Sequence, residues 1–419
     1  MKKEHLMING PDTKKQKLEK PQTYQCEYII PKKNKRCRML RKKQNKYCSE
    51  HMIHDNTSKQ KRIPCPLNPN HTIWEKDLST HLEKCNARPA SDHPVWYMEN
   101  FNYKLANSTE VTFVDGPEQD VSYYREIVDE IHFEPLERKE CQHDGLLQQL
   151  EEKTNQKHVI QQSSLIGNLK RLGLLSPRLF YMEFGCGKGE LSRCVNQCVL
   201  HDSPESDKSY GFGLIDRGTN RLKADNKIKQ DSEPFNVTPI VKRSKIDIKH
   251  LNVDKFLEDV HPNQVVAISK HLCGAATDLT LKSLLNSSLF KNGKFGGVLI
   301  AMCCRHVCFE DEFLPQSKRY LIDHGFKTPQ SIKALKKMVS WGVNLDIDSR
   351  DKAESDLTAK QRYEYGIKAR RIIDESRVFA LKSLLGNDYE IEIFHYVDPD
   401  VTKENVCLSI TRKSKLTDE

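Results

Sequence analysis

The chain has 419 residues, of which 37% are hydrophobic and 30% are charged, and its formal net charge is +9. At about 150 residues per domain, this length predicts two or three domains. The charge is uneven, because residues 1–63 hold 18 Lys and Arg against 6 Asp and Glu, which is a net +12 and leaves −3 for the remainder. This pattern excludes a uniformly basic protein and indicates one segment that meets a polyanion.

Membrane and secreted classes are not supported by the sequence. Its longest apolar run, Phe295–Cys304, has ten residues, whereas a membrane helix needs about 20. The N-terminus is charged and lacks the apolar region of a secretory signal. We therefore expect a soluble intracellular protein of the cytoplasm or nucleus. In a reducing compartment, its 14 cysteines should bind metal or take part in catalysis rather than form disulfides.

The chain divides by composition into five parts. Residues 1–22 are rich in Lys with little apolar content, which predicts a disordered basic tail. Two compact Cys/His clusters define small domains at 23–54 and 61–90. Residues 91–145 mix aromatic and polar stretches without a clear period, as in a linker or irregular segment. The remainder, 146–419, is expected to form one larger domain.

The larger domain has the alternating pattern of an α/β fold. A helical pattern over Leu146–Leu175 is followed by short apolar runs with helical or polar stretches between them, which predicts a parallel sheet. Two further runs, Tyr389–Val397 and Val406–Thr411, are joined by eight residues, too few for a crossover helix, and so predict an antiparallel pair. The five parallel runs are Leu179–Phe184, Tyr210–Ile215, Ile246–Ile248, Val265–Ser269 and Gly297–Met302.

The second Cys/His cluster predicts a zinc site. Cys65, His71, His81 and Cys85 have the spacing C-x5-H-x9-H-x3-C. Helix formers over Glu75–Lys84 put the last two one helical turn apart on one face, and four such ligands suit tetrahedral zinc. The alternative is a pair of buried cysteines with incidental histidines.

The first cluster predicts a second zinc ion. Cys26, Cys37, Cys48 and His51 have the spacing C-x10-C-x10-C-x2-H, and His54 is a rival fourth ligand. A segment this short and basic cannot bury a sufficient core, so a metal is the expected source of its folding free energy.

Cations lie between the ligands of the first cluster, and Tyr28 and Tyr47 lie near them. A charge run is usually only a solvated surface. Cations held on a folded finger beside aromatic rings are better explained as a surface that contacts phosphates. They are Lys32, Lys33, Lys35, Arg36, Arg38, Arg41, Lys42, Lys43 and Lys46.

A glycine-rich loop follows the first predicted strand of the larger domain. Because glycine has no side chain, such a loop lets a ligand come close to the backbone. The ligand can then accept hydrogen bonds from the unpaired N–H groups at the start of the following helix. Glu190 stands where a dinucleotide fingerprint needs its third Gly, and the loop also lacks the G-K-S/T of a P-loop. The pattern E-x-G-x-G-x-G instead resembles the first motif of class I methyltransferases that use S-adenosylmethionine. Its residues are Glu183, Gly185, Gly187 and Gly189.

Two acidic residues follow the next predicted strands. Asp216 ends the second run and is expected to hold ribose hydroxyls of this cofactor. Asp247 lies in the third run and resembles the acid that contacts the adenine amine. Each alone is more often a helix cap or a surface residue, but their register with successive strands favours cofactor contact.

The fourth and fifth strands end in side chains suited to catalysis. Ligands of open α/β sheets bind outside the carboxyl ends of the strands, where the fourth run leads into Lys270, His271 and Cys273. Lys270 and His271 are candidates for the base or cation that a weakly acidic hydroxyl needs.

Cysteine chemistry is the alternative at these strand ends. Cys273, or Cys303 and Cys304 at the end of the fifth run, could act as the nucleophile of a C5 methylation. No Pro precedes Cys273, which argues against this mechanism, and the N/D-P-P-Y/F motif of amino-group methyltransferases is absent. Whether Cys303, Cys304 and His306 are catalytic or only structural stays open.

Together these segments resemble the eukaryotic tRNA 2′-O-methyltransferase family that modifies the fourth nucleotide of the acceptor stem. One departure is Arg305, where His is expected directly after the cysteine pair, and it puts a catalytic role at position 305 in doubt. The matching pieces are the two fingers, Lys157-His158, Gln161-Gln162, Glu183–Gly189, Lys270–Leu279 and Cys303-Cys304.

The resemblance implies methyl transfer from S-adenosylmethionine to a ribose 2′-hydroxyl of tRNA, with two Zn²⁺ ions in the fingers. It implies a class I methyltransferase fold with an antiparallel C-terminal hairpin. A nonenzymatic zinc-finger RNA-binding adaptor is a further alternative, against which the intact glycine motif argues. No feature of the sequence calls for an obligate protein partner or a membrane.

Overall fold

The structure is a computed structural model that forms two compact units, Met1–Asp92 and His93–Glu419. The predicted disordered tail at 1–22 lies outside the described residues. The structure describes residues 24–31, 34–55, 57, 61–85, 88, 93–117, 119–152, 156–203, 209–220, 222–343 and 357–413.

The first finger of unit 1 is built on its cysteines. Cys26, Cys37 and Cys48 form its buried cluster, against which Tyr28 and Tyr47 pack. So small a core agrees with the expectation that a metal must stabilise the finger. Its elements are β1 (Tyr24–Gln25), β2 (Ile29–Ile30), β3 (Lys35–Arg36), β4 (Leu40–Arg41) and η2 (His51–His54), with β1 paired to β4 and β2 to β3.

The second finger is a hairpin followed by a helix. The helix expected over Glu75–Lys84 is present as a 3-10 turn that continues into α1. Glu50 of the first finger accepts a hydrogen bond from the backbone N–H of Thr72 at 3.1 Å, so the two fingers contact each other. The elements are β5 (Arg62–Cys65), β6 (Asn68–Trp74), η3 (Glu75–Asp77) and α1 (Leu78–Lys84).

Unit 2 is an α/β domain around a seven-stranded sheet of order β12-β13-β11-β10-β7-β8-β9. β13 runs antiparallel to both of its neighbours, and the other neighbouring pairs are parallel. The predicted α/β class with an antiparallel C-terminal hairpin is therefore confirmed. The strands are β7 (Phe180–Phe184), β8 (Gly211–Asp216), β9 (Ile240–Lys245), β10 (Val265–Cys273), β11 (Phe295–Cys303), β12 (Tyr389–His395) and β13 (Val406–Arg412).

The third strand lies earlier than the sequence predicted. The apolar run Ile246–Ile248 was expected to form it, but β9 is Ile240–Lys245, and Asp247 caps the 3-10 turn that follows. β9 is an edge strand whose side chains are mostly half-buried or exposed. It therefore lacks the continuous apolar run of a central parallel strand.

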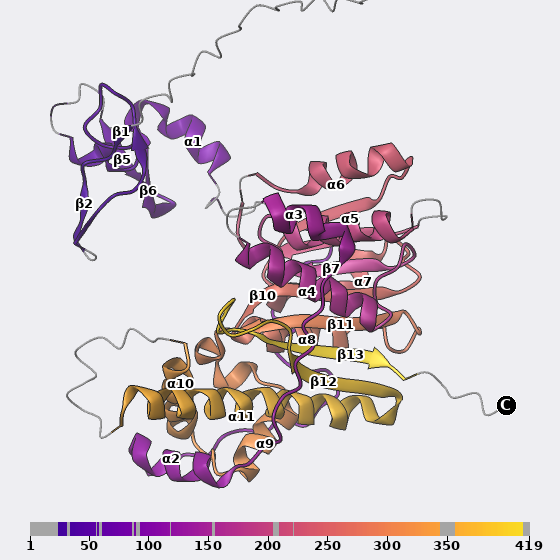
Figure 1. Ribbon diagram of the computed structural model, residues 1–419. Coiled ribbons are helices and arrows are strands. Elements are labelled where there is room, and N and C mark those ends of the chain that lie inside the picture. The colour runs from indigo at the N-terminus through magenta and orange to yellow at the C-terminus, as the bar shows by residue number, and fades with distance from the viewer. Residues whose placement is uncertain are drawn as a thin grey trace, which may run out of the picture. The chain divides into compact units, whose positions relative to one another are not determined.

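Helices cover both faces of the sheet (Figure 1). In β10, Val265 and Ala267 join the core under α7, α8 and α11, whereas Val266 and Ile268 join the core under α4 and α5. This alternation is the period of two expected of a strand buried on both faces. The helices are α3 (Leu147–Glu152), α4 (Lys157–Arg171), α5 (Glu190–Asp202), α6 (Asp225–Ser232), α7 (Val253–Leu257), α8 (Ala275–Leu285) and α11 (Ala359–Leu385).

A further group of helices packs against α11, which itself contacts β12. Tyr124, Phe326, Leu335 and Ile372 belong to its separate core, and Figure 1 shows its helices grouped around α11. The helices are α2 (Val121–Glu130), α9 (Pro315–Asp323) and α10 (Pro329–Trp341). Short 3-10 turns in unit 2 are η4 (Asp144–Leu146), η5 (Glu233–Phe235), η6 (Ile248–His250), η7 (Arg305–Val307), η8 (Glu310–Glu312) and η10 (Gly386–Asp388).

The segment predicted as a linker or irregular stretch, 91–145, is integrated into unit 2 over its described residues. It contains α2, and Trp96 donates to Ser244 Oγ at 2.7 Å. Asn102 is buried and donates to the carbonyls of Ile248 and Leu251, both at 2.7 Å. These contacts fix the turn that carries Asp247.

Candidate active site and metal centres

The glycine loop leaves β7 in a conformation that only glycine adopts readily. Gly185, Gly187 and Gly189 have φ of +65°, +51° and +84°, where other residues cost about 1–2 kcal/mol. A Cβ on Gly185 would lie 2.9 Å from the backbone carbonyl oxygen of His271. The loop after β7 and the end of β10 thus approach each other directly.

Asp216 joins the glycine loop to the end of β8. Its two carboxylate oxygens accept hydrogen bonds from the N–H groups of Gly187 and Gly218, both at 2.7 Å. Asp216, the residue predicted to bind the ribose, is therefore held at the mouth of the loop by backbone N–H donors.

Arg243 on β9 supports the same loop and was not predicted from the sequence. Its guanidinium donates to the carbonyl oxygens of Gly187 at 2.9 Å and Lys188 at 3.1 Å. Asp225 holds the guanidinium in place through bonds of 2.9 and 2.7 Å. No local motif marks this residue, because it lies more than fifty residues from the loop it supports.

Glu183, the acid of the glycine motif, lies beneath the loop rather than in the cavity. Its carboxylate accepts from the backbone N–H of Ser192 at 3.0 Å and from the Ser192 hydroxyl at 2.5 Å. Burial raises the pKa of Glu183 to about 7. The residue thus ties β7 to the first turn of α5.

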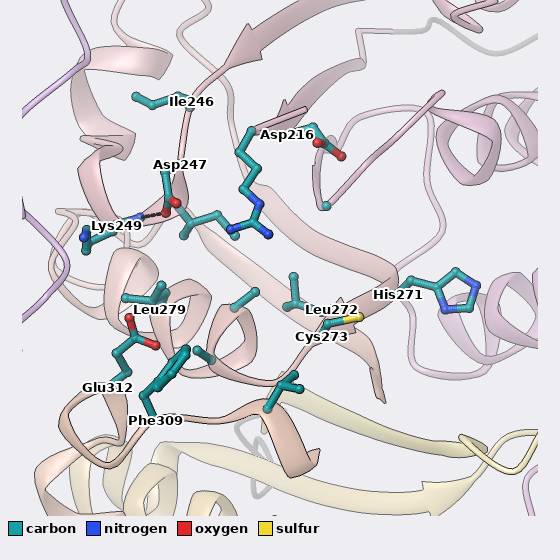
Figure 2. A pocket seen from close by; sticks show the side chains of 16 residues that line it. Asp216, Ile246, Asp247, Lys249, His271, Leu272, Cys273, Leu279, Phe309 and Glu312 are labelled. Atoms are coloured by element: carbon teal, nitrogen blue, oxygen red, sulfur yellow. Dashed lines mark hydrogen bonds between the residues drawn. The ribbon is translucent and has the colours of Figure 1, made fainter. Parts of the chain in front are cut away.

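A cavity of about 620 Å³ opens at the carboxyl ends of β7, β8 and β10 (Figure 2). This volume lies within the range of about 300–1,000 Å³ common for small-molecule sites. The order of the sheet reverses between β7 and β10, the switch point where such sheets bind ligands. Predicted residues in its wall are Gly185, Asp216, Asp247, His271 and Cys273.

The cavity wall also contains residues to which the sequence assigned no role of their own. Val307 and Phe309 follow β11, line the cavity and are 44% and 59% exposed. Glu312 and Leu279 lie close to Phe309 in Figure 2, across from Asp216. Exposed apolar side chains often mark a binding site, but the sequence does not show which apolar residues are exposed, so it could not identify Val307 and Phe309.

Asp247 lies in the cavity wall as the cap of η6. Its carboxylate accepts from the Lys249 N–H at 2.9 Å, as drawn in Figure 2. Asp247 can therefore cap η6 and also contact a cofactor, because the cap uses only one of its two carboxylate oxygens.

Lys270 and His271 lie on β10 with different environments. Lys270 Nζ donates to His158 Nδ1 on α4 at 2.9 Å, and burial lowers the pKa of Lys270. His271 is in the cavity wall and is exposed, and in Figure 2 its ring points away from the other labelled residues. Desolvation by the surrounding protein, together with Lys270 and His158, lowers the pKa of His271 to about 4. His271 is therefore neutral at pH 7.

Cys273 belongs to a cluster of three thiols with Cys303 and Cys304. Its Sγ is exposed and lies 3.2 Å from Cys303 Sγ on the neighbouring strand. The hydrogen bond from the Cys303 thiol lowers the pKa of Cys273 to about 6, and that same contact raises the pKa of Cys303. Cys273 is thus the thiolate of the cluster at neutral pH.

Arg305, the departure from the expected His, is fully buried and does not line the cavity. Its guanidinium forms bonds of 3.0 and 2.8 Å to the Asp374 carboxylate on α11. It also contacts Glu404 at 2.5 Å, and Glu404 accepts from the Cys304 N–H at 3.0 Å. Arg305 therefore holds the strand end next to the thiols instead of acting on a ligand.

The first finger brings its four predicted ligands together. Cys26, Cys37, Cys48 and His51 have their ligand atoms within 4.8 Å of one another. His51 Nδ1 lies 3.5 Å from Cys26 Sγ and 3.4 Å from Cys48 Sγ. Tetrahedral zinc places S and N ligands about 3.5 Å apart, so the set fits Zn²⁺. The rival ligand His54 instead stacks on the Tyr28 ring.

The second finger gathers Cys65, His71, His81 and Cys85 in the same way. The two sulfurs are 3.6 Å apart, and the two Nε2 atoms are 3.2 Å apart. Tetrahedral zinc gives about 3.8 Å for two sulfurs and about 3.3 Å for two nitrogens, so this set also fits Zn²⁺.

Comparison with known families agrees with this order of parts. The family described as Methyltransferase TRM13 matches residues 160–411. A CCCH zinc finger in TRM13 protein matches residues 24–52, and a U11-48K-like CHHC zinc finger matches residues 62–86. The methyltransferase assignment implies S-adenosylmethionine as the cofactor, and the two finger types together with their Cys/His clusters fit two Zn²⁺ ions.

Curated relatives match almost the whole chain. Proteins named tRNA:m(4)X modification enzyme TRM13 are 50% identical in Debaryomyces hansenii, with 95% of each chain covered, and 34% identical in Saccharomyces cerevisiae, with 97% of this chain and 99% of that one covered. A cyclopropane-fatty-acyl-phospholipid synthase-like protein from Lactobacillus casei covers 69% of this chain and 99% of its own at 13% identity and a TM-score of 0.23, which carries no argument. On the family match and these relatives, the chain belongs to the TRM13 methyltransferase family.

Proposed function

We propose that this protein transfers a methyl group from S-adenosylmethionine to a ribose 2′-hydroxyl at position 4 of the tRNA acceptor stem. The observation that carries the proposal is the cavity at the switch point, which joins the glycine loop to His271 and Cys273. The relatives named as tRNA:m(4)X modification enzymes support tRNA as the substrate.

The cofactor residues have distinct proposed roles. Gly185 lets the ligand approach the backbone, Asp216 accepts from the ribose hydroxyls, and Asp247 accepts from the adenine amine. Gly187 and Gly189 keep the loop in its left-handed turns. Glu183 acts from beneath, by fixing the loop to α5 through Ser192.

The bound cofactor supplies an electrophilic methyl group, so the protein must orient the hydroxyl and remove its proton. His271 is neutral at pH 7 and lies in the cavity wall, which suits it to accept that proton. Lys270 is bound to His158 and does not line the cavity, so its proposed part is to supply positive charge from beside the wall as charge develops on the oxygen. Cys273 lines the same cavity and is proposed to contact the substrate.

The pH dependence separates the two candidate bases. If His271 accepts the proton, kcat rises through a pH of about 4 and is flat across neutral pH. If Lys270 accepts it, kcat continues to rise above neutral pH until Lys270 is deprotonated. Lys270→Ala should slow turnover with cofactor affinity unchanged, and unaltered turnover would remove Lys270 from the mechanism.

The product of the reaction tests the 2′-hydroxyl directly. Protein, tRNA and tritiated S-adenosylmethionine are incubated, and the RNA is digested with alkali. A 2′-O-methyl group protects its phosphodiester, so label should appear in an alkali-resistant dinucleotide that mass spectrometry maps to position 4. Label in ordinary mononucleotides would contradict the proposal, and failure to bind the cofactor in calorimetry would favour the nonenzymatic adaptor.

A cysteine-dependent C5 methylation is the second candidate, because Cys273 is an exposed thiolate in the cavity wall. In that mechanism Cys273→Ala abolishes activity, and RNA containing a 5-fluoropyrimidine traps a covalent protein–RNA adduct. In the 2′-O mechanism Cys273→Ala retains measurable turnover and no adduct forms.

The first finger is proposed to contact tRNA phosphates through only part of its predicted cations. Arg36 and Arg41 donate to backbone carbonyls of the finger, at 2.8 Å to Cys26 and 2.7 Å to Asn45 respectively. Those two therefore stabilise the finger. Among the described residues, the exposed cations left for phosphate contacts are Lys35, Arg38, Lys42, Lys43 and Lys46, and the predicted Lys32 and Lys33 lie outside the described residues. Zinc removal should weaken tRNA binding more than cofactor binding.

We also infer that the protein works in the cytoplasm or nucleus without an obligate partner. None of the 14 cysteines is in a disulfide, which suits a reducing compartment. Among the described residues, no helix has the length and apolar character needed to cross a bilayer. Imaging of a tagged chain tests the location, and activity of the purified chain alone tests the absence of a partner.

A further inference from the structure

A second cavity, of about 570 Å³, lies beside β12 and β13. Its wall comes from residues 131–138, from the first half of α11, and from the connection between the two strands. His395 at the end of β12 and Val406 at the start of β13 both line it. Because β12 is parallel to β11, this cavity lies at the same edge of the sheet as the first one.

The wall of the second cavity is cationic. Its lining residues include two acids, Glu134 and Asp374, and the Asp374 carboxylate is already bound to Arg305. Acids outside the wall also pair with its cations, Asp129 with Lys368 at 2.6 Å and Asp398 with Arg138 at 3.2 Å.

The guanidiniums of Arg370 and Arg371 already pair with Glu404 and Glu375, both at 2.7 Å. Phosphate contacts would therefore fall mainly to the exposed Arg138 and to Lys403. The cations in the wall are Arg138, Lys368, Arg370, Arg371 and Lys403.

Aromatic and apolar side chains accompany these cations. Phe133 and Tyr363 line the cavity, with the Arg371 guanidinium 5.4 Å from the Phe133 ring and Lys403 Nζ 5.5 Å from the Tyr363 ring. Ile367, also in the wall, is 40% exposed. Cations next to flat aromatic rings are the combination that binds a nucleotide, with phosphate on the cations and the base against a ring.

A chain of contacts connects the two cavities. Cys273 lines the first cavity and lies in the thiol cluster with Cys304. The Cys304 N–H donates to Glu404, and Glu404 accepts from Arg370 Nη2 at 2.7 Å. Arg370 lines the second cavity. The two cavities therefore lie at the same edge of the sheet and share one network of hydrogen bonds.

We propose that the second cavity binds a further nucleotide of the substrate RNA, outside the nucleotide that enters the first cavity. The inference rests on the proposed function and deepens it, because it adds a part of unit 2 that holds RNA. Specificity for an RNA strand would then depend on this cavity as well as on the fingers.

The test uses full-length zinc-loaded protein with Lys403→Ala, Tyr363→Ala and Tyr363→Phe, and with Lys382→Ala as the control. Lys382 is an exposed cation on the same helix outside the cavity. Affinity for fluorescently labelled tRNA is measured by anisotropy at several salt concentrations. Affinity for S-adenosylmethionine is measured by calorimetry.

We expect Tyr363→Ala to weaken tRNA binding by about fivefold or more and Tyr363→Phe to restore it, because the ring supplies the stacking surface. Lys403→Ala should reduce the slope of log K against log salt by about 0.7 to 1. Lys382→Ala should match the original chain, and cofactor affinity should be equal in all variants.

Unchanged tRNA affinity and salt slope in both alanine variants would overturn the inference, whatever the activity of the original chain. A free nucleotide has the same chemistry, so AMP is titrated into cofactor-saturated protein. AMP binding that Lys403→Ala abolishes, with tRNA affinity unchanged, would also overturn the RNA assignment. If the unsubstituted protein forms no 2′-O-methylated product, only the proposed function is contradicted. The binding test stays valid because anisotropy does not depend on turnover.

Discussion

The two units of this chain are stabilised in different ways. In unit 1, the buried cluster of the first finger is three cysteines that are also proposed metal ligands. In unit 2, two apolar cores cover the faces of the sheet and a third lies among the helices around α11. The first unit should depend on an ion, and the second on the area it buries.

The units also treat their cations differently. The first finger exposes Lys42, Lys43 and Lys46 to solvent. Unit 2 buries Arg305 and Arg377 in ion pairs with acids on neighbouring elements. The same residue types therefore serve a solvent-facing surface in one unit and the interior in the other.

Removal of zinc should give the largest change in stability. If both units unfolded on metal removal, the contrast between a metal-dependent unit 1 and a core-dependent unit 2 would be wrong. Zinc contributes about 10–16 kcal/mol in small finger peptides, so chelation should unfold both fingers and leave unit 2 folded. Hydrogen exchange of residues 24–85 and of the sheet strands measures this. Protection of the fingers without metal would contradict the contrast, and Cys48→Ser should reproduce the effect of chelation in the first finger.

Truncation of a core side chain in unit 2 should destabilise unit 2 and leave the fingers of unit 1 folded. Phe256 is fully buried against Trp96, with ring centroids 5.5 Å apart. Phe256→Ala should cost about 3–5 kcal/mol of the free energy of unfolding of unit 2, with two zinc ions still bound. Urea unfolding followed by Trp fluorescence, with metal analysis of the same sample, checks both parts. Loss of zinc in this variant would show that the units are coupled.

Two glycines of unit 2 can separate the cost of backbone strain from the loss of cofactor contact. Gly173 and Gly185 both have positive φ, +69° and +65°, but a Cβ meets a nearby atom only at Gly185. Each substitution by Ala should cost about 1–2 kcal/mol of stability. Only Gly185→Ala should weaken cofactor binding, by about tenfold or more. Equal affinities in calorimetry would remove the loop from the cofactor site.

The contact between the two fingers should give the smallest effect. Glu50→Gln removes a charge that faces Arg62 at 3.9 Å and keeps an acceptor for Thr72. Because the Glu50 side chain is half exposed, we expect a loss below about 1 kcal/mol. Hydrogen exchange along β6 measures it, and a larger loss would mean that the fingers fold as one body.

Local patterns in the sequence predicted the parts that local chemistry controls. The ligand sets of the fingers follow from the spacing of Cys and His, because chelation needs few residues at short range. The glycine loop follows from Gly185, Gly187 and Gly189 in the same way. Most strands of the sheet were readable from their apolar runs, since a parallel strand buried on both faces carries little polar sequence.

The tertiary structure decided what depends on distant contacts. β9 escaped prediction because an edge strand keeps polar residues. Glu183 proved to be buried under the loop, and Arg243 supports the loop from another strand. The thiolate of Cys273 exists because β10 and β11 place Cys303 beside it. Arg305 took an interior role because Asp374 and Glu404 meet it there.

The sequence by itself therefore determined the family and the order of the fingers and the methyltransferase domain, and it predicted the metal ligands and the cofactor motif. Its uneven charge also located the basic surface, although the guanidiniums of Arg36 and Arg41 are bound to backbone carbonyls of the finger itself. Only the tertiary structure decided which side chains line the cavities, which acids are buried and which thiol is ionised. These properties depend on desolvation and pairing between residues far apart in the chain, which no local pattern encodes.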